Sequence, residues 1–79
     1  MEYRVFKESV GWSEGLFIID SNLSFKEIKT NPSTSFLSKK NYLGLFKFDE
    51  NFLNLLQSKK VGDYYIYYEY LWERDRLIT

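Results

Sequence analysis

Few side chains in this sequence could do chemistry. Its 79 residues contain no histidine and no cysteine, which removes the commonest general base and the most nucleophilic side chain. The remaining candidates are two carboxylate pairs, Asp49 with Glu50 and Glu73 with Asp75, which could hold a hard cation through oxygen atoms. However, the first pair stands where a helix is expected to begin, and arginines alternate with the second pair. We therefore predict that the chain is not an enzyme and has no metal site and no cofactor.

The glycines do not form a phosphate-binding loop. Four glycines are present, at positions 11, 15, 44 and 62, and no two of them are closer than four residues apart. None follows a strand into a helix with the spacing that a phosphate cradle needs. The sequence therefore gives no sign of a nucleotide phosphate site of this type.

The feature that departs most from an average composition is a cluster of tyrosines near the C-terminus. Five of them lie within seven positions: Tyr64, Tyr65, Tyr67, Tyr68 and Tyr70. Aromatic residues fit a pleated surface better than a helix, so residues 63–72 predict a long strand. Its even positions, from Tyr64 to Trp72, are expected to form the core under a helix. Its odd positions face the other way.

The odd face of this strand is the predicted binding surface. Tyr65, Tyr67 and Leu71 are expected to have no second helix covering them, and an exposed aromatic stripe normally marks a binding surface. Tyrosine and tryptophan dominate the hot spots of protein interfaces. The predicted partner-binding residues are Tyr65, Tyr67, Leu71, Trp12, Arg74 and Arg76.

Two further classes of function stay open, a single-stranded nucleic-acid binding module and a small nucleotide-binding oligomer. In the first, aromatics would stack on unpaired bases while lysines between positions 26 and 47 hold phosphates. The chain as a whole has eleven basic and eleven acidic residues, and the tyrosine-rich strand is flanked by Asp63, Glu69, Glu73 and Asp75. A phosphate-binding surface would need cations beside the aromatics. Protein binding is therefore favoured, with a foreign partner or with a second copy in a homodimer.

Several segments predict the strands of an antiparallel sheet. Residues 2–8 are β-favouring and alternate Tyr3 and Val5 with Arg4 and Phe6. Leu16 to Ile19 predicts a short buried strand, and Tyr42 to Phe48 predicts another. Residues 30–40 are rich in hydroxyls and predict a loop in which Phe36-Leu37 is the apolar anchor.

Residues 24–30 allow two interpretations. Alternation after the turn at Asp20-Ser21-Asn22 favours a hairpin over residues 16–28. Ser24 and Glu27 also fit a capping box, which would begin a short helix that Asn31-Pro32 ends. The hairpin is preferred and the short helix is the alternative.

The strongest helix signals lie in residues 50–60. Asp49 can cap a helix there, and two lysines followed by Gly62 are typical of a helix C-terminus. Its apolar face would be Phe52, Leu53, Leu55 and Leu56. The predicted fold is therefore α+β, with a four- to five-stranded antiparallel sheet and one helix, at about residues 50–60, packed on one face.

Length and composition place the chain in a broad class. Seventy-nine residues predict a single domain spanning residues 1–79. The lack of cysteine and of a secretory signal favours a cytoplasmic protein, and the longest apolar run, Leu16 to Ile19, is far too short to span a membrane. The chain has no alanine and is rich in Lys, Asn, Ser, Phe and Tyr. That profile resembles small phage or mobile-element proteins that inhibit host enzymes or defence systems, and we predict a non-catalytic, protein-binding inhibitor of this kind.

Overall fold

Five strands form one antiparallel sheet in the computed structural model, which describes residues 2–11 and 13–73, with side chains described through residue 70. The elements in chain order are β1 (Glu2–Val10), β2 (Ser13–Asp20), α1 (Phe25–Thr30), the 3-10 turn η1 (Lys39–Asn41), β3 (Tyr42–Lys47), α2 (Glu50–Leu53), β4 (Gln57–Val61) and β5 (Tyr64–Glu73). The spatial order is β3-β1-β2-β5-β4, and every neighbouring pair is antiparallel. The predicted α+β class, with an antiparallel sheet, is confirmed.

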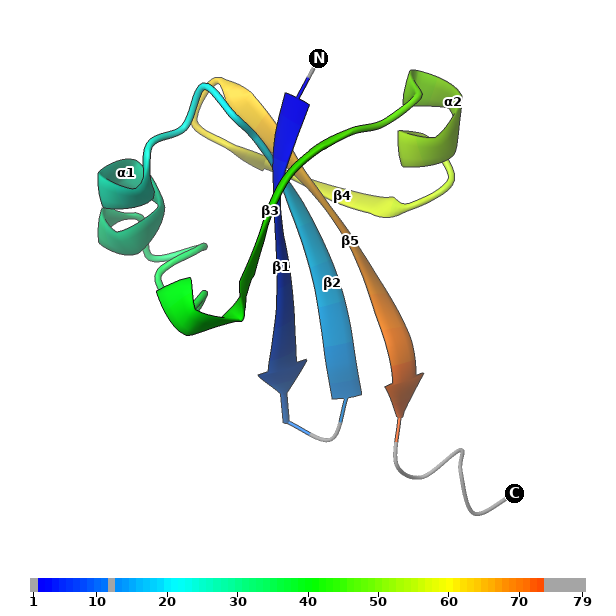
Figure 1. The fold of residues 1–79 in the computed structure, drawn as a ribbon, viewed down its shortest axis with the longest axis horizontal. Helices are drawn as coiled ribbons and strands as arrows, with labels where there is room; N and C mark the ends of the chain where they lie inside the picture. Colours follow the sequence, from blue (N-terminus) through cyan, green and yellow to red (C-terminus); the bar gives the residue numbers. More distant parts are fainter. Residues whose placement is uncertain (1, 12, 74–79) are drawn as a thin grey trace.

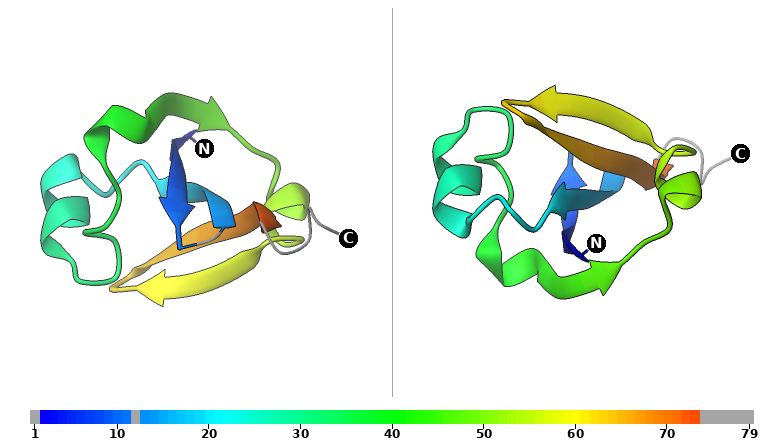
Figure 2. Two further views of the ribbon diagram at one scale, coloured as in Figure 1. Left: turned by 90° about the horizontal axis from the view of Figure 1, so that it is seen from below. Right: turned by 90° about the horizontal axis from the view of Figure 1, so that it is seen from above.

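The sheet buries apolar side chains on both of its faces, which we call the α1 face and the α2 face after the helix on each (Figures 1 and 2). The α1 face holds the larger cluster, formed by Phe6, Phe17, Ile19, Leu23, Ile28, Leu37, Val61 and Ile66. The α2 face holds Tyr3, Val5, Ile18 and Leu53. Because successive strand residues point to opposite faces, the apolar run Leu16 to Ile19 of β2 contributes side chains to both clusters.

The prediction of a single helix over residues 50–60 on one face is wrong. Asp49 does cap a helix, and its side chain accepts a hydrogen bond from the Asn51 amide, but α2 ends at Leu53. Residues 57–61 instead form strand β4, which pairs with β5 from Gln57–Tyr68 to Val61–Tyr64. Two short helices lie on opposite faces of the sheet (Figure 1).

The misassigned signals have a second physical meaning. Gly62 has φ +62°, a conformation that glycine adopts without steric cost. Here it follows β4 in the two-residue turn Gly62-Asp63 of a hairpin. Lys59 and Lys60 are exposed on β4, and lysines on an edge strand discourage pairing with other chains. Lysines followed by glycine are therefore compatible with an edge strand and its turn as well as with the C-terminus of a helix.

The preferred hairpin over residues 16–28 is also wrong, and the alternative helix is the one that forms. Ser24 accepts a hydrogen bond from the Glu27 amide, and Glu27 in turn accepts from the Ser24 amide. This capping box satisfies amides that the first turn of a helix leaves unpaired. Ile28 is buried against the α1-face cluster, so packing adds to the local signal.

Residues 31–41 are anchored to the sheet by buried polar contacts. The Thr34 hydroxyl donates to the Ile28 carbonyl at 2.6 Å. The Glu8 carboxylate accepts from the Ser38 amide at 2.7 Å and from the Asn41 side-chain amide. Leu37 is fully buried between these anchors. The predicted loop therefore covers one side of the α1 face.

Candidate binding surfaces

Acidic side chains do not gather into a metal site in the described part of the chain. No group of three or more His, Cys, Asp or Glu residues is gathered closely enough to hold a metal ion within this part of the chain. Asp49 is used as a helix cap, as the sequence indicates. Glu73 and Asp75, the second predicted pair, fall outside the described side chains. No helix within the described residues is long and apolar enough to cross a membrane.

The predicted anchors Tyr65 and Tyr67 lie on the same face of β5, but only one of them is free to meet a partner. Tyr65 is 50% exposed. Tyr67 pairs across the sheet with Ile18 and packs against the α2-face cluster. Its ring meets Tyr3 edge-on, with centroids 6.4 Å apart. The expectation that no helix covers this face is thus wrong for Tyr67, because Leu53 of α2 is part of the same cluster.

Burial also changes the acidity of Tyr3, the centre of this cluster. Desolvation raises the pKa of its hydroxyl, and Tyr67, Asp20 and Glu50 raise it further. The neutral phenol is therefore favoured, as expected for a core side chain. Tyr3 and Tyr67 belong to the core of the α2 face.

The structure does not describe the side chains of the remaining predicted anchors. Leu71 belongs to β5, but its side chain lies outside those described. Trp12, Arg74 and Arg76 lie outside the described residues.

A row of phenylalanines is partly exposed on the α2 face, although the sequence predicts Phe52 on the apolar face of a helix. Phe46 of β3 is 46% exposed and Phe52 of α2 is 41% exposed. Phe48 lies between them, with ring centroids 6.4 Å from Phe46 and 5.7 Å from Phe52. Leu55, directly after α2, is 84% exposed. The large apolar residues exposed on this face or beside it are Phe46, Phe52, Leu55 and Tyr65, which we call the α2-face patch.

The α2-face patch could not be predicted from the sequence, because the predicted helix at residues 50–60 is longer than the observed α2. A helix through residue 60 would have turned Phe52, Leu53, Leu55 and Leu56 together towards the sheet. In the single turn that forms, Leu53 alone of these four is fully buried, Leu56 is half-buried against the same cluster, and Leu55 is exposed.

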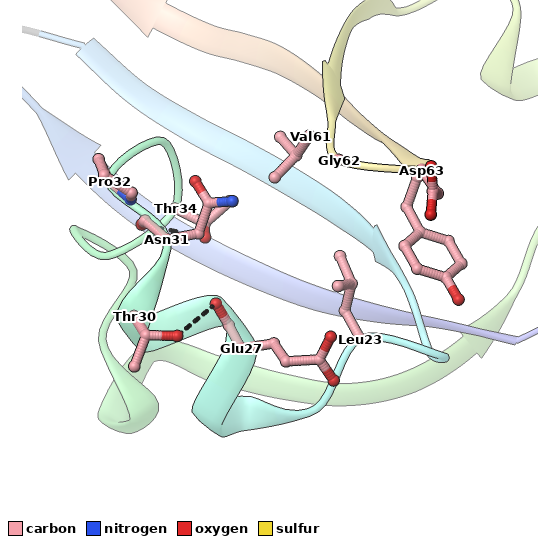
Figure 3. Close-up of a pocket in the computed structure, with 10 residues that line it drawn as sticks. Leu23, Glu27, Thr30, Asn31, Pro32, Thr34, Val61, Gly62 and Asp63 are labelled. Carbon is pink, nitrogen blue, oxygen red and sulfur yellow. Dashed lines mark hydrogen bonds between the residues drawn. The ribbon is translucent and has the colours of Figure 1, made fainter.

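The α1 face carries two hollows between the segment Asn31–Phe36 and the β4–β5 hairpin. One is a cleft of about 440 Å³ lined by α1, by Asn31, Pro32 and Thr34, and by Val61 to Tyr64 (Figure 3). The other, of about 230 Å³, is lined by Ser33 and Phe36 of the segment and by Lys59, Ile66, Tyr68 and Tyr70 of the hairpin, with Val10 and Phe17. Both hollows are lined by neighbouring cross-strand pairs on one face of the β4–β5 ladder, Val61–Tyr64 in the cleft and Lys59–Ile66 in the smaller hollow. We call the two together the hairpin groove.

The smaller hollow is built from a chain of aromatic rings. Phe36 meets Phe17 edge-on at 5.2 Å, Phe17 stacks on Tyr68 at 6.1 Å, and Tyr68 meets Tyr70 at 6.0 Å between centroids. Gly15 makes this arrangement possible, since a Cβ there would lie 2.6 Å from the Phe17 ring. Phe36 and Tyr70 remain 46% and 41% exposed at the rim. The sequence predicts Phe36 as an apolar anchor of a loop. It does not indicate that Gly15 leaves room for the ring of Phe17.

Comparison of the chain with protein-family models, with curated proteins and with solved structures finds no match.

Proposed function

We propose that the chain is a small non-catalytic module that binds another protein through the α2-face patch. The observation that carries the proposal is the patch itself, in which Phe46, Phe52, Leu55 and Tyr65 expose large apolar side chains on one face. Aromatic and leucine side chains that stay in water without covering one another favour association with a complementary apolar surface.

The charges around the patch are mixed and give no net attraction for phosphate, because Lys60 lies opposite Tyr65 in the β4–β5 ladder while two carboxylates also lie near the patch. Glu50 precedes Phe52 in α2, and Glu69 is exposed on the same face of β5 as Tyr65. Two cations elsewhere are already engaged, because Arg4 and Lys39 lie over the Phe25 ring at 4.7 and 5.3 Å. The carboxylates near the patch would offset the attraction of Lys60 for phosphates. Single-stranded nucleic-acid binding and nucleotide binding by an oligomer are alternatives with less support.

The experiment is site-specific photo-crosslinking in cells of the organism that encodes the chain. A photoreactive amino acid at position 55 should capture one dominant protein, identified by mass spectrometry. Phe52→Ala and Tyr65→Ala should each weaken binding to that protein by about 2 kcal/mol or more, as hot-spot truncations do. Tyr70→Ala removes an equally exposed ring from the other face and should leave binding unchanged.

Equal capture by all three variants would contradict the proposal. Capture of nucleic acid, or of a second copy of the chain, would replace the foreign protein with one of the alternatives. The narrower prediction of a phage or mobile-element inhibitor acting in the cytoplasm rests on composition, and the identity of the captured protein tests it directly.

A further inference from the structure

We infer that the hairpin groove on the α1 face is a second binding site, for an extended peptide segment that carries a basic residue and an aromatic or large aliphatic residue four positions apart. The inference shares with the proposed function only the class of partner, and it concerns the opposite face of the sheet. The groove's shape, its charge and its apolar hollow each point to this occupant.

The dimensions fit an extended chain. The lining residues of β5 run from Tyr64 to Tyr70, and six residues of strand span about 20 Å. The opposite wall is the segment Asn31–Phe36, which Thr34 and Leu37 hold in place from buried positions. A groove with two anchored walls is formed before binding, which lowers the entropy cost of taking up a ligand.

One end of the groove is acidic. Glu27 reaches the cleft from α1, and Asp63 reaches it from the turn of the hairpin (Figure 3). The Glu27 atom Oε1 accepts hydrogen bonds from Ser24, but no described residue donates to its Oε2. No described residue donates to the Asp63 carboxylate either. Two carboxylates on facing walls favour a cationic side chain and disfavour a phosphate.

The other end is mainly apolar, although Ser33 and Lys59 also line it. The floor of the smaller hollow is formed by Phe17 and Ile66, which are 4% and 3% exposed, while Phe36 and Tyr70 stand at its rim. One ring or branched aliphatic side chain entering between these rims would bury apolar surface on all sides. The cleft includes Tyr64, and the smaller hollow is lined by Ile66, Tyr68 and Tyr70, so its middle lies four residues further along β5. In an extended ligand, positions that share a face at this separation are i and i+4.

The test uses two synthetic pentapeptides with capped ends, titrated into the isotopically labelled full chain and followed by amide chemical shifts. The first has arginine at position one and phenylalanine at position five, and the second replaces the arginine with glutamate. The first should shift amides of residues 31–36 and 59–70 and should bind about fivefold more tightly, the upper range for an exposed ion pair. Loss of this preference in the double variant Glu27→Gln, Asp63→Asn is expected, whereas Glu69→Gln on the opposite face should keep it.

A second pair of variants tests the hollow. Tyr70→Ala should weaken both peptides, and Tyr65→Ala, its matched control on the opposite face, should weaken neither. Because Tyr65 belongs to the α2-face patch, failure of the groove and failure of the proposed function are separable. Equal binding of the two peptides, or shifts confined to residues outside the groove, would overturn the inference. Tighter binding of a short oligothymidine to the same amides would overturn it in favour of nucleic acid.

Discussion

Two buried polar side chains, Glu8 and Thr34, decide how residues 31–41 sit on the sheet. Within the described part of the chain, no cation pairs with the Glu8 carboxylate. Glu8 instead accepts hydrogen bonds from the Ser38 amide and from Asn41, and Thr34 donates to the Ile28 carbonyl. A buried carboxylate is costly unless hydrogen-bond donors surround it. A segment without strand structure is thereby fixed by specific donors and acceptors, and it becomes one wall of the hairpin groove.

Replacing Asn41 with aspartate tests this role at the level of one residue. The change removes a donor from Glu8 and puts a second carboxylate against it, so the free energy of unfolding should fall by about 2 to 3 kcal/mol in urea denaturation. Asn22→Asp, in an exposed turn, should change it by less than about 0.5 kcal/mol. Adding Glu8→Gln to Asn41→Asp exchanges the carboxylate and the amide and should recover part of the loss. No recovery would show that packing, not hydrogen bonding, holds this contact.

At the scale of elements, α1 depends on its N-terminal cap because it is only six residues long. Isolated helices of this length are not stable in water. The Ser24–Glu27 capping box and the burial of Ile28 must both contribute to holding it. Ser24→Ala should therefore lower the free energy of unfolding by about 1 kcal/mol, measured by thermal or urea denaturation. Ser35→Ala, an exposed serine of the same neighbourhood, is the control and should have little effect. Equal effects of the two would mean that the cap is dispensable.

Some strands could be predicted from the sequence, and one could not. The strands predicted at residues 2–8, 42–48 and 63–72 form as β1, β3 and β5, with bounds within two residues of those predicted, because β-favouring types and alternation agree there. Residues 57–61 could not be predicted as a strand from their own side chains, since Gln-Ser-Lys-Lys has little preference for one. Their strand conformation comes from pairing with β5, a contact made after a two-residue turn. The same error hid both proposed binding surfaces, since the positions of the α2-face patch and the hairpin groove depend on where α2 ends and β4 begins.

For the whole molecule, the two edges of the sheet differ in how they meet other chains. The β4 edge exposes Lys59 and Lys60, which oppose pairing with another strand. The β3 edge exposes Leu43 and Leu45, but its ladder with β1 shifts register between Val5 and Phe6. A bulge of this kind bends an edge strand and shortens the stretch that could pair with another chain. We therefore expect the isolated chain to be a monomer.

Light scattering over a dilution series, with the double variant Lys59→Val, Lys60→Val beside the wild type, tests this protection. The wild type should keep the mass of one chain at every concentration, and the variant should form dimers or larger species, because an apolar β-branched edge pairs readily with a second copy. Lys39→Val, Lys40→Val removes the same charge from η1, which is not part of an edge strand, so it should stay monomeric. If the two double variants associate equally, loss of charge and not the strand edge drives association. A wild-type dimer would instead assign the exposed apolar residues to contacts between two copies, and the search for a foreign partner would then begin from that dimer.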